Sequence, residues 1–294
     1  MLLFVYGTLL KGMEREFILD GSQYVGPAML QAKLFDLGSY PGIKMGRGMV
    51  FGELYEINEV TLGSLDRLEG YKPNQIKNSL YLRREIKIQK MDGNNVQAFC
   101  YFYNHEVKNY DFMIDGDYRR FKLEQEAEDQ WILAYGSNVS TNRLIKRIGE
   151  IKASKKGYID GFSLKFNKQA TGKQVAYANI IYAGAGEKCP AVAYQLTPDQ
   201  TAALDRFEGV PHNYLRLSIP FHSHSDNKSI VQAYIAHPNK LVTGLDVEYE
   251  YIEHILHGYR EHKFDENYLT KILERTNSFR APTTEYQPVF ADER

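Results

Sequence analysis

The sequence predicts an α+β fold made of two tandem copies of one domain. Two short motifs each occur twice along the chain. A Tyr-Gly-Thr string at Tyr6–Thr8 returns as Tyr-Gly-Ser at Tyr135–Ser137, and a Leu-Asp-Arg-x-Glu-Gly string at Leu65–Gly70 returns at Leu204–Gly209. Strand-like and helix-like segments follow the same order around these motifs in both copies. Ordered motifs that recur together indicate an internal duplication.

The spacing within each copy supports the duplication. The second motif follows the first after 62 residues, from Gly7 to Glu69, and after 72 residues, from Gly136 to Glu208. A chain of 294 residues is long enough for two ordinary domains, each with a core of its own. We therefore expect a first domain over residues 1–118, a linker or short solvated helix over 119–130, and a second domain over 131–294.

The first copy contains β patterns on both sides of one helical pattern. Apolar residues at helical spacing predict a helix over Glu59–Glu69 that stops at Gly70. The turn residues Met91–Asn95 predict a hairpin between the last two strands. The predicted strands are Leu2–Tyr6, Ala32–Leu37, Val50–Ile57, Tyr81–Gln89 and Val96–Tyr103.

The second copy restarts at Trp131, repeats this order and adds a C-terminal extension. Apolar residues at helical spacing predict a helix with one apolar face over Tyr251–Tyr259, followed by a helical pattern over Asn267–Arg275. The segment Thr276–Arg294 contains two prolines and no periodicity, so we expect an irregular or mobile tail.

The composition excludes several classes of protein. Apolar residues make up 43% and charged residues 25%, as in a soluble globular protein, and no apolar run is long enough to span a membrane. The net charge of -1 provides no basic field for nucleic acid or an anionic membrane. Cys100 and Cys189 form no C-x-x-C pair, which predicts reduced thiols in a cytoplasmic protein. The histidines between residues 212 and 224 lack partners for a metal, so we expect a solvated loop around Pro220–Asn227 and no metal site.

Glu69 and Glu208 are the candidate catalytic residues. Each falls in the last turn of a predicted helix, immediately before a glycine. A negative charge there faces the negative end of the helix dipole, which costs roughly 0.3–1 kcal/mol and raises the pKa of the carboxyl group. A raised pKa suits a group that transfers protons near neutral pH. The alternative is an exposed Glu that ends a helix, with the neighbouring Asp66 and Asp205 on the solvated surface.

The two Tyr-Gly loops are candidate substrate-binding sites. Each loop closes an apolar strand and precedes an expected helix, which begins near Gly12 in the first copy and near Ser140 in the second. Glycine allows a sharp turn and close approach to a ligand, and amides at such a turn can hold a carboxylate or an oxyanion. The alternative is that the hydroxyl residues only cap a turn. The candidate residues are Tyr6, Gly7, Thr8 and Leu9 in the first copy, and Tyr135, Gly136, Ser137 and Asn138 in the second.

These motifs together resemble the gamma-glutamylcyclotransferase-like superfamily. The resemblance rests on a strand that ends in Tyr-Gly-Ser/Thr, a helix that ends in Leu-Asp-x-x-Glu-Gly, and a Tyr-x-Arg strand, found here at Tyr81–Arg83 and Tyr214–Arg216. It covers most of both copies. The tandem arrangement resembles that of two-domain bacterial members.

The two copies resemble different branches of this superfamily. The first copy, with Tyr40–Ile43 and Gly52–Tyr55, resembles the gamma-glutamylamine cyclotransferase branch. The second, with Ala178–Asn179 and Glu208–Val210, resembles the gamma-glutamylcyclotransferases themselves. Because Leu9 of the first loop differs from the Asn of the second, the two pockets need not share a substrate.

The resemblance implies that each domain is a small mixed β-barrel flanked by helices. It also implies a small-molecule γ-glutamyl substrate whose glutamyl part is held by the loop backbone, with Glu69 and Glu208 as general acid/base. The α-amine of the substrate would attack its γ-carbonyl and release 5-oxoproline with a free amine or amino acid. No cofactor, metal ion or nucleic acid takes part. A non-catalytic binding or sensor module that keeps the pocket is the alternative.

Overall fold

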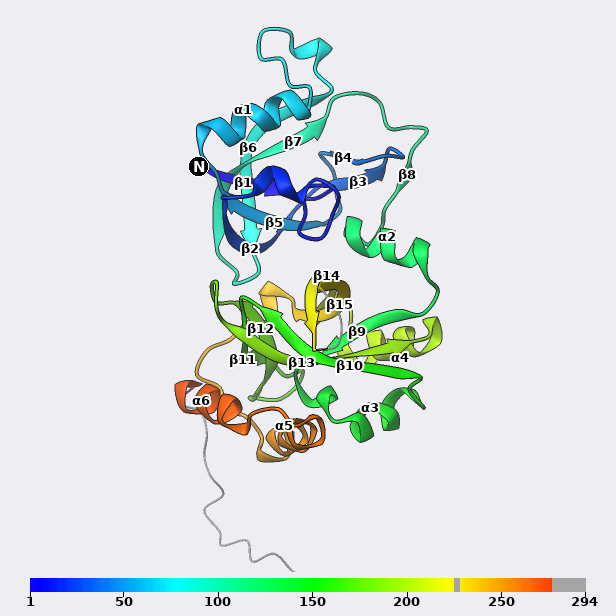
Figure 1. Cartoon of the computed structure of the whole chain (residues 1–294), viewed down its shortest axis with the longest axis vertical. Coiled ribbons are helices and arrows are strands. Elements are labelled where there is room, and N and C mark those ends of the chain that lie inside the picture. Colours follow the sequence, from blue (N-terminus) through cyan, green and yellow to red (C-terminus); the bar gives the residue numbers. More distant parts are fainter. Residues whose placement is uncertain (225–227, 277–294) are drawn as a thin grey trace, which may run out of the picture.

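The computed structural model describes residues 1–224 and 228–276. These residues form two domains stacked along the long axis of the molecule, each around a closed β-barrel (Figure 1). The predicted α+β fold with two tandem barrel domains is therefore confirmed.

The first domain contains the strands β1 (Leu2–Val5), β2 (Gln23–Leu30), β3 (Lys33–Asp36), β4 (Pro41–Lys44), β5 (Val50–Glu56), β6 (Tyr81–Lys90), β7 (Asn95–Tyr103) and β8 (Asp111–Phe112). Its barrel has the order β1-β5-β2-β6-β7. Neighbouring strands are antiparallel, except that β7 runs parallel to β1 and closes the barrel. The strands β3, β4 and β8 form a separate sheet.

The second domain repeats this topology with the strands β9 (Gln130–Ala134), β10 (Ala153–Asp160), β11 (Phe162–Gln169), β12 (Ala176–Tyr182), β13 (Lys188–Leu196), β14 (Tyr214–Ser223) and β15 (Lys228–Ala236). Its barrel has the order β10-β13-β9-β15-β14, and β15 runs parallel to β9. The hairpin of β11 and β12 stands where β3 and β4 stand in the first domain. Closure of a barrel leaves no unpaired sheet edge.

The helices lie outside the barrels (Figure 1), and those that carry the two motif glutamates have well-defined starts. The α-helices are α1 (Glu59–Leu68), α2 (Tyr118–Glu126), α3 (Thr141–Ile148), α4 (Pro198–Glu208), α5 (Tyr249–His262) and α6 (Glu266–Thr276). The motif glutamates stand at the ends of α1 and α4. The Asn58 side chain caps α1 and accepts the amide of Thr61 at 2.9 Å. Thr197 begins α4 through a capping box with Gln200.

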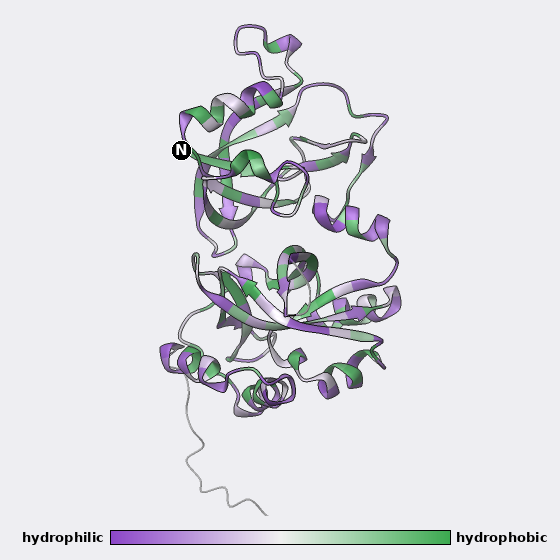
Figure 2. Ribbon diagram, in the orientation of Figure 1, coloured by the Kyte–Doolittle hydropathy of each residue, from purple (hydrophilic) through white to green (hydrophobic). Residues whose placement is uncertain are grey.

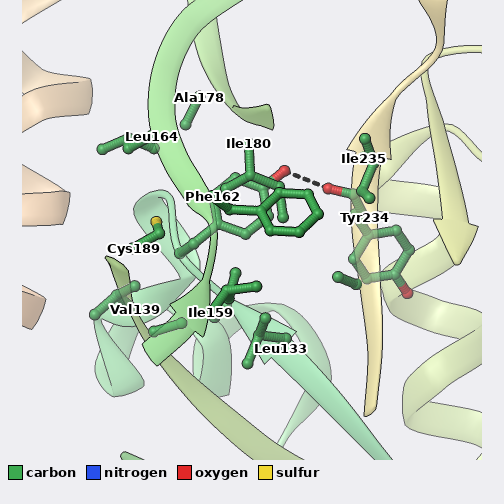
Figure 3. Close-up of a cluster of buried hydrophobic side chains, with 14 of the residues drawn as sticks. Leu133, Val139, Ile159, Phe162, Leu164, Ala178, Ile180, Cys189, Tyr234 and Ile235 are labelled. Carbon is green, nitrogen blue, oxygen red and sulfur yellow. Dashed lines mark hydrogen bonds between the residues drawn. The ribbon is translucent and has the colours of Figure 1, made fainter. Parts of the chain in front are cut away.

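Each barrel encloses an apolar core. In the second domain, side chains from β9, β10, β11, β12 and β15 converge on one cluster, shown in Figure 3 by Leu133, Ile159, Phe162, Ile180 and Ile235. Met29 and Met91 of the first domain also belong to this cluster. The two domains therefore share buried apolar surface, which holds them together.

Two local predictions are wrong. The helix expected near Gly12 is a single 3₁₀ turn over Glu16–Leu19, because Gly12 has a positive φ of 82°, which an α-helix does not allow. The solvated loop expected from Pro220 belongs to β14 as far as Ser223, where residues alternate between buried and half-buried. Residues 225–227 and the expected tail after Thr276 lie outside the described residues.

The segment expected to be a linker or short solvated helix is the helix α2. Most of this helix is hydrophilic (Figure 2), but Tyr118 and Arg119 in its first turn are buried. The prediction of solvation is therefore wrong for this turn, because it lies between the two domains. The division of the chain at residues 118 and 131 stays a prediction.

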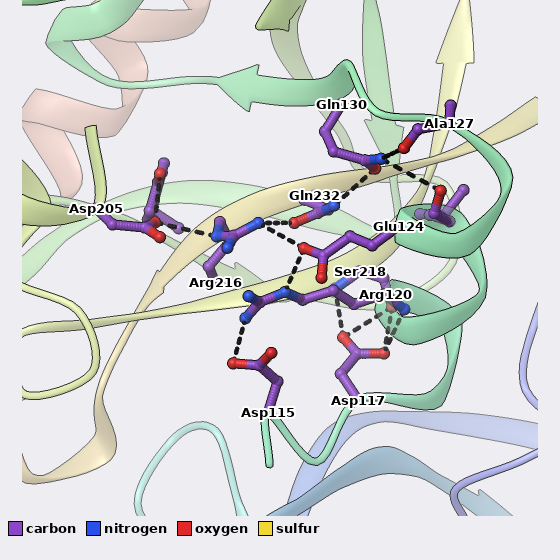
Figure 4. A network of polar contacts seen from close by, with 12 residues as sticks. Asp115, Asp117, Arg120, Glu124, Ala127, Gln130, Asp205, Arg216, Ser218 and Gln232 are labelled. Carbon is purple, nitrogen blue, oxygen red and sulfur yellow. Dashed lines mark hydrogen bonds and ion pairs between the residues drawn. The ribbon is translucent and has the colours of Figure 1, made fainter. Parts of the chain in front are cut away.

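Arg119 connects the two domains through buried polar contacts. Its guanidinium donates to Glu53 Oε1 at 2.7 Å in the first domain and to the Ser218 carbonyl at 2.7 Å in the second. Only 6% of the Arg119 side chain and 1% of the Glu53 side chain are exposed. Asp117 accepts the Ser218 amide at 2.6 Å (Figure 4). A buried ion pair that water does not screen thus holds Arg119 against the first domain, and hydrogen bonds to Ser218 join it to the second.

We predict that Arg119→Met destabilises the protein by about 3–5 kcal/mol, because it leaves the Glu53 carboxylate buried without its counter-charge. Addition of Glu53→Gln should recover part of this loss. Urea unfolding followed by circular dichroism measures both effects, with Glu126→Gln, an exposed site on the same helix, as the control. A loss below about 0.5 kcal/mol for Arg119→Met, as expected of a surface charge, would contradict the assignment.

Candidate functional site

A cavity of about 60 Å³ opens where β1 ends in the first domain. All the residues predicted for this site line it, namely Tyr6, Gly7, Thr8, Leu9 and Glu69. The barrel strand ends beside the C-terminus of α1, so two motifs that are distant in sequence meet at one cavity.

The second domain contains a corresponding, larger cavity of about 290 Å³ where β9 ends. It is lined by all the residues predicted there, namely Tyr135, Gly136, Ser137, Asn138 and Glu208. The loop and the carboxyl group are in direct contact, because Asn138 Nδ2 donates to Glu208 Oε1 at 2.8 Å.

Both loops make the same turn. The amide of Leu10 donates to the Gly7 carbonyl at 3.0 Å, and the amide of Val139 donates to the Gly136 carbonyl at 3.0 Å. Among the described residues, no protein acceptor is hydrogen-bonded to the amides of Thr8, Leu9 and Asn138. These amides are therefore free to bind an oxygen atom of a ligand.

The glycines of the loops are required by close packing. A Cβ atom on Gly7 would lie 2.6 Å from Cγ of Pro41, and one on Gly136 would lie 2.8 Å from Cβ of Ala178. Both distances are shorter than any real contact between carbon atoms. Any side chain would therefore push the loop away from the β4 or β12 strand.

A tyrosine in each loop ties it to the barrel. The Tyr6 hydroxyl donates to the Tyr101 carbonyl at 2.7 Å, and the Tyr135 hydroxyl donates to the Tyr234 carbonyl. Both loop tyrosines are buried. Buried hydroxyl groups that find a partner fix the position of the segment that carries them.

A second pair of tyrosines closes the other side of each cavity. Tyr81 donates to the Pro41 carbonyl at 2.6 Å, and Tyr214 donates to the Ala178 carbonyl at 2.7 Å. These are the tyrosines of the Tyr-x-Arg motif, and all four residues line their cavities. The equivalent bonds show that β4 and β12 occupy equivalent places.

Asp66 and Asp205, three residues before each glutamate, bind the barrel wall. Asp66 accepts the Tyr101 hydroxyl at 2.7 Å, and Asp205 accepts the Tyr234 hydroxyl at 2.7 Å. The solvated surface considered for both aspartates is therefore wrong. Both copies of the motif contain this Asp as well as the Glu. Its repetition was the sequence signal that could have predicted a structural role for it.

The arginines of the Tyr-x-Arg motif complete this arrangement. Arg83 forms an ion pair with Asp66, and Arg216 forms one with Asp205 at 3.0 Å. Arg216 also contacts Glu124 of α2 at 3.0 Å (Figure 4). The helix between the domains thus supports the frame that holds α4 and its glutamate.

Burial raises the pKa of Glu69 from 4.5 to about 7, and the positive charge of Arg15 opposes this shift only in part. The carboxyl group has no hydrogen-bond partner among the described residues. The predicted direction of the shift agrees with this finding, but removal of the group from water is its main cause.

Glu208 has a different environment. Burial again raises its pKa, while Arg147 and the hydrogen bond from Asn138 act in the opposite direction. Arg147 Nη1 also donates to Asn138 Oδ1 at 3.0 Å. The Asn138 side chain, the Arg147 guanidinium and the Glu208 carboxyl group therefore form one cluster. The first domain has Leu9 in place of Asn138 and lacks this cluster in the described residues.

Several residues that line the cavities escaped prediction. Arg15 and Tyr40 line the first cavity; Arg143, Arg147, Lys168, Tyr177 and Tyr251 line the second. Tyr251 comes from α5, whose apolar face predicted only a core role. The cationic residues carried no motif, although two of them lie on the helix that directly follows the loop.

Within residues 1–224 and 228–276, no group of three or more His, Cys, Asp or Glu side chains is placed to hold a metal ion. In the same part of the chain, no helix combines the length and the apolar character needed to cross a membrane.

Comparison with known proteins finds the same duplication. The family model described as gamma-glutamyl cyclotransferase, AIG2-like, matches residues 3–120 and again residues 132–254. The matched segments cover both barrels and both cavities.

Individual relatives match parts of the chain. Gamma-L-glutamyl-butirosin B gamma-glutamyl cyclotransferase from Niallia circulans is 31% identical over 125 residues, which is 42% of this chain and 78% of that protein. A relative from Vibrio cholerae is 44% identical over 70 residues, which is 23% of this chain and 61% of the relative, less than two thirds of its length. The crystal structure of YkqA from Bacillus subtilis has a TM-score of 0.76 at 20% identity and covers 95% of this chain and 98% of its own. This last likeness shows a shared fold across both domains.

We predict that Glu69→Gln stabilises the protein at high pH. The folded state, with a pKa of about 7 at Glu69 against 4.5 in the reference state, binds the proton more tightly than the unfolded chain. The contribution of this group to stability is therefore complete below pH 4.5 and lost as the pH rises through 7. At pH 8 the variant should be more stable than wild type by up to about 3 kcal/mol.

Urea unfolding of both proteins from pH 4 to pH 8 tests this prediction. Glu59→Gln, at an exposed site on the same helix, is the control. A stability difference that does not change across this pH range would contradict a buried carboxyl group with a raised pKa.

Proposed function

The chain belongs to the gamma-glutamyl cyclotransferase, AIG2-like family, and we propose that its pockets convert γ-glutamyl compounds into 5-oxoproline and a free amine or amino acid. The main support is the same arrangement in both domains. A carboxyl group with a raised pKa lines one cavity with a turn whose amides have no protein acceptor in the described residues.

The proposed reaction is an intramolecular acyl transfer. The α-amine of the substrate forms a bond to its own γ-carbonyl carbon and closes a five-membered ring. The bond from that carbon to the leaving nitrogen then breaks. Because both reacting groups belong to one bound molecule, correct orientation can contribute about 7–11 kcal/mol to lowering the barrier.

Glu69 and Glu208 are the proposed proton carriers. The α-ammonium has a reference pKa of about 8 and must lose a proton before it can attack. The carboxylate accepts that proton and delivers it to the leaving nitrogen as the bond to the γ-carbon breaks. The attacking nitrogen gives up its second proton to the same carboxylate as the lactam forms, and the released amine takes up this proton, so the protons balance and no redox partner is needed. A carboxyl pKa near 7, as at Glu69, suits proton transfer in both directions near neutral pH.

The loop amides are the proposed binding groups. In the first domain the amides of Thr8 and Leu9 can hold a substrate carboxylate or the oxyanion that forms on the attacked carbonyl; in the second, the amide of Asn138 can do so. The tyrosines that tie each loop to the barrel hold these amides in place before the substrate arrives.

A binding module without turnover is the second candidate, and one observation in the first domain favours it. The cavity there is only about 60 Å³, against about 290 Å³ in the second domain. A regulatory first domain would bind a γ-glutamyl compound and raise the melting temperature of the protein without forming product.

We predict that the wild-type protein releases 5-oxoproline from γ-glutamyl amino acids or γ-glutamylamines. Each of Glu69→Gln and Glu208→Gln should remove the activity of its own domain by about 10²- to 10⁴-fold, and the double variant should be inactive. Chromatographic detection of 5-oxoproline is the measurement. The controls Glu59→Gln and Asp199→Asn change exposed carboxyl groups at the other ends of the same helices. Undiminished release by the double variant would exclude both glutamates from the reaction.

We also predict the pH dependence of the first site. In a Glu208→Gln variant, kcat/KM should rise with pH around a midpoint of about 7, since Glu69 must be ionised to accept the ammonium proton. Initial rates from pH 5.5 to pH 8 measure this profile. A rate that falls as the pH increases through 7 would mean that the protonated form of Glu69 is the active one.

A further inference from the structure

Lys168 is a buried cation with no ion-pair partner among the described residues; burial lowers its pKa, and the charge of Glu208 across the cavity offsets this only in part. Only 4% of the residue is exposed, and it lines the cavity of the second domain. In the described part of the chain, its ammonium has no carboxylate within ion-pair distance and no hydrogen-bond acceptor; it lies 5.2 Å from the ring centre of Tyr214. Burial of an ammonium group costs free energy unless an opposite charge or an acceptor compensates it.

A bulge in the β11–β12 hairpin places this lysine. The register of the hairpin shifts between Phe166 and Lys168, so Lys168 pairs with Tyr177. Bulges occur next to functional sites, where they redirect a side chain. In the hairpin of the first domain, the amide of Leu37 donates to the Tyr40 carbonyl, as Lys168 pairs with Tyr177 in the second. The apolar Leu37 therefore takes the place of the lysine.

Arg143 is a second cation on the same cavity. It lies on α3, and its buried Nε atom has no hydrogen-bond partner among the described residues. The nearby Arg147 is already engaged by Asn138 and Glu208. Burial and the positive charge of Arg147 lower the pKa of Arg143, and the charge of Glu208 offsets this only in part.

The charges of the two cavities therefore differ. Arg15 and Glu69 are the charged residues that line the first, so its charges balance when Glu69 is ionised. The second is lined by Arg143, Arg147 and Lys168 against Glu208 alone, which leaves an excess of two positive charges. The α-carboxylate and α-ammonium of a γ-glutamyl group cancel each other, so the excess matches negative charge elsewhere in the substrate.

We propose, on the basis of the proposed function, that Lys168 and Arg143 bind a carboxylate on the leaving group and make the second pocket selective for γ-glutamyl amino acids or peptides over γ-glutamylamines. The larger cavity has room for this longer leaving group. Charge-assisted hydrogen bonds to a carboxylate are among the stronger polar contacts, and exclusion of water at Lys168 strengthens them further.

A matched pair of substrates tests the proposal. γ-Glutamyl-alanine and γ-glutamyl-alaninamide differ in the charge of the leaving group and keep the same glutamyl part. In a Glu69→Gln variant, we expect 5-oxoproline to form only at the second site. We expect kcat/KM to favour the alanine compound by about 10- to 100-fold, the size of a charge-assisted hydrogen bond.

The variants then assign this preference to the two cations. Lys168→Gln and Arg143→Gln should each reduce it by about 10-fold or more, largely through KM for the alanine compound. Lys168→Arg should retain much of it. The control Arg206→Gln removes an exposed positive charge from α4, outside the cavity, and should leave the preference unchanged. Thermal melting of every variant identifies any failure to fold.

Equal losses for both substrates in Lys168→Gln would mean that the lysine binds the glutamyl carboxylate instead, and would overturn the proposal. If the wild type releases no 5-oxoproline from any substrate, the proposed function fails. In that case, calorimetric binding of the two compounds to the Glu208→Gln protein tests the selectivity of the second pocket without turnover. A preference for γ-glutamyl-alanine that Lys168→Gln abolishes supports the proposal, and equal affinities overturn it.

Discussion

Partial burial of one carboxyl group beside a cavity is the constraint around which each domain is organised. Glu69 and Glu208 end a helix next to a glycine loop, where neither burial nor the helix dipole favours a negative charge. The surrounding frame holds them there. Tyrosine hydroxyl groups fix the loop and the opposing strand to the barrel, and an Asp three residues earlier binds a barrel tyrosine. The closed barrel thus keeps a glutamate carboxyl group and unbonded loop amides at one cavity.

The two domains share this frame and differ in what surrounds the glutamate. In the first, the Glu69 carboxyl group lines a small cavity and has no hydrogen-bond partner among the described residues. In the second, Asn138 and Arg147 bind Glu208, and two further cations line a larger cavity. The two domains therefore share the backbone that positions the glutamate, our proposed proton carrier, and differ in the side chains that line the cavity around it. The junction at Arg119 and Ser218 connects the two domains that carry these sites.

Motifs on regular elements were predictable, and side chains placed by tertiary contacts were not. The repeated strings located both loops and both glutamates, because a strand end and a helix end carry them to the cavity. Closure of the barrels was predicted only from the family resemblance, because a strand pattern in the sequence does not show which strands pair at the edges of a sheet. Lys168 depends on a bulge, which shifts the register that alternation would predict. Arg119 sits in a charged segment typical of a solvated helix, and only the docking of the second domain buries it.

A crystal structure of the wild-type protein with 5-oxoproline tests the central claim most directly. Product should occupy the second cavity, with an oxygen atom within hydrogen-bond distance of the Asn138 amide and the lactam ring beside the Glu208 carboxyl group. The first cavity should show the same arrangement at Thr8 and Glu69 if that domain also turns over. Product bound away from both loops, or both glutamates turned out into solvent, would contradict the account.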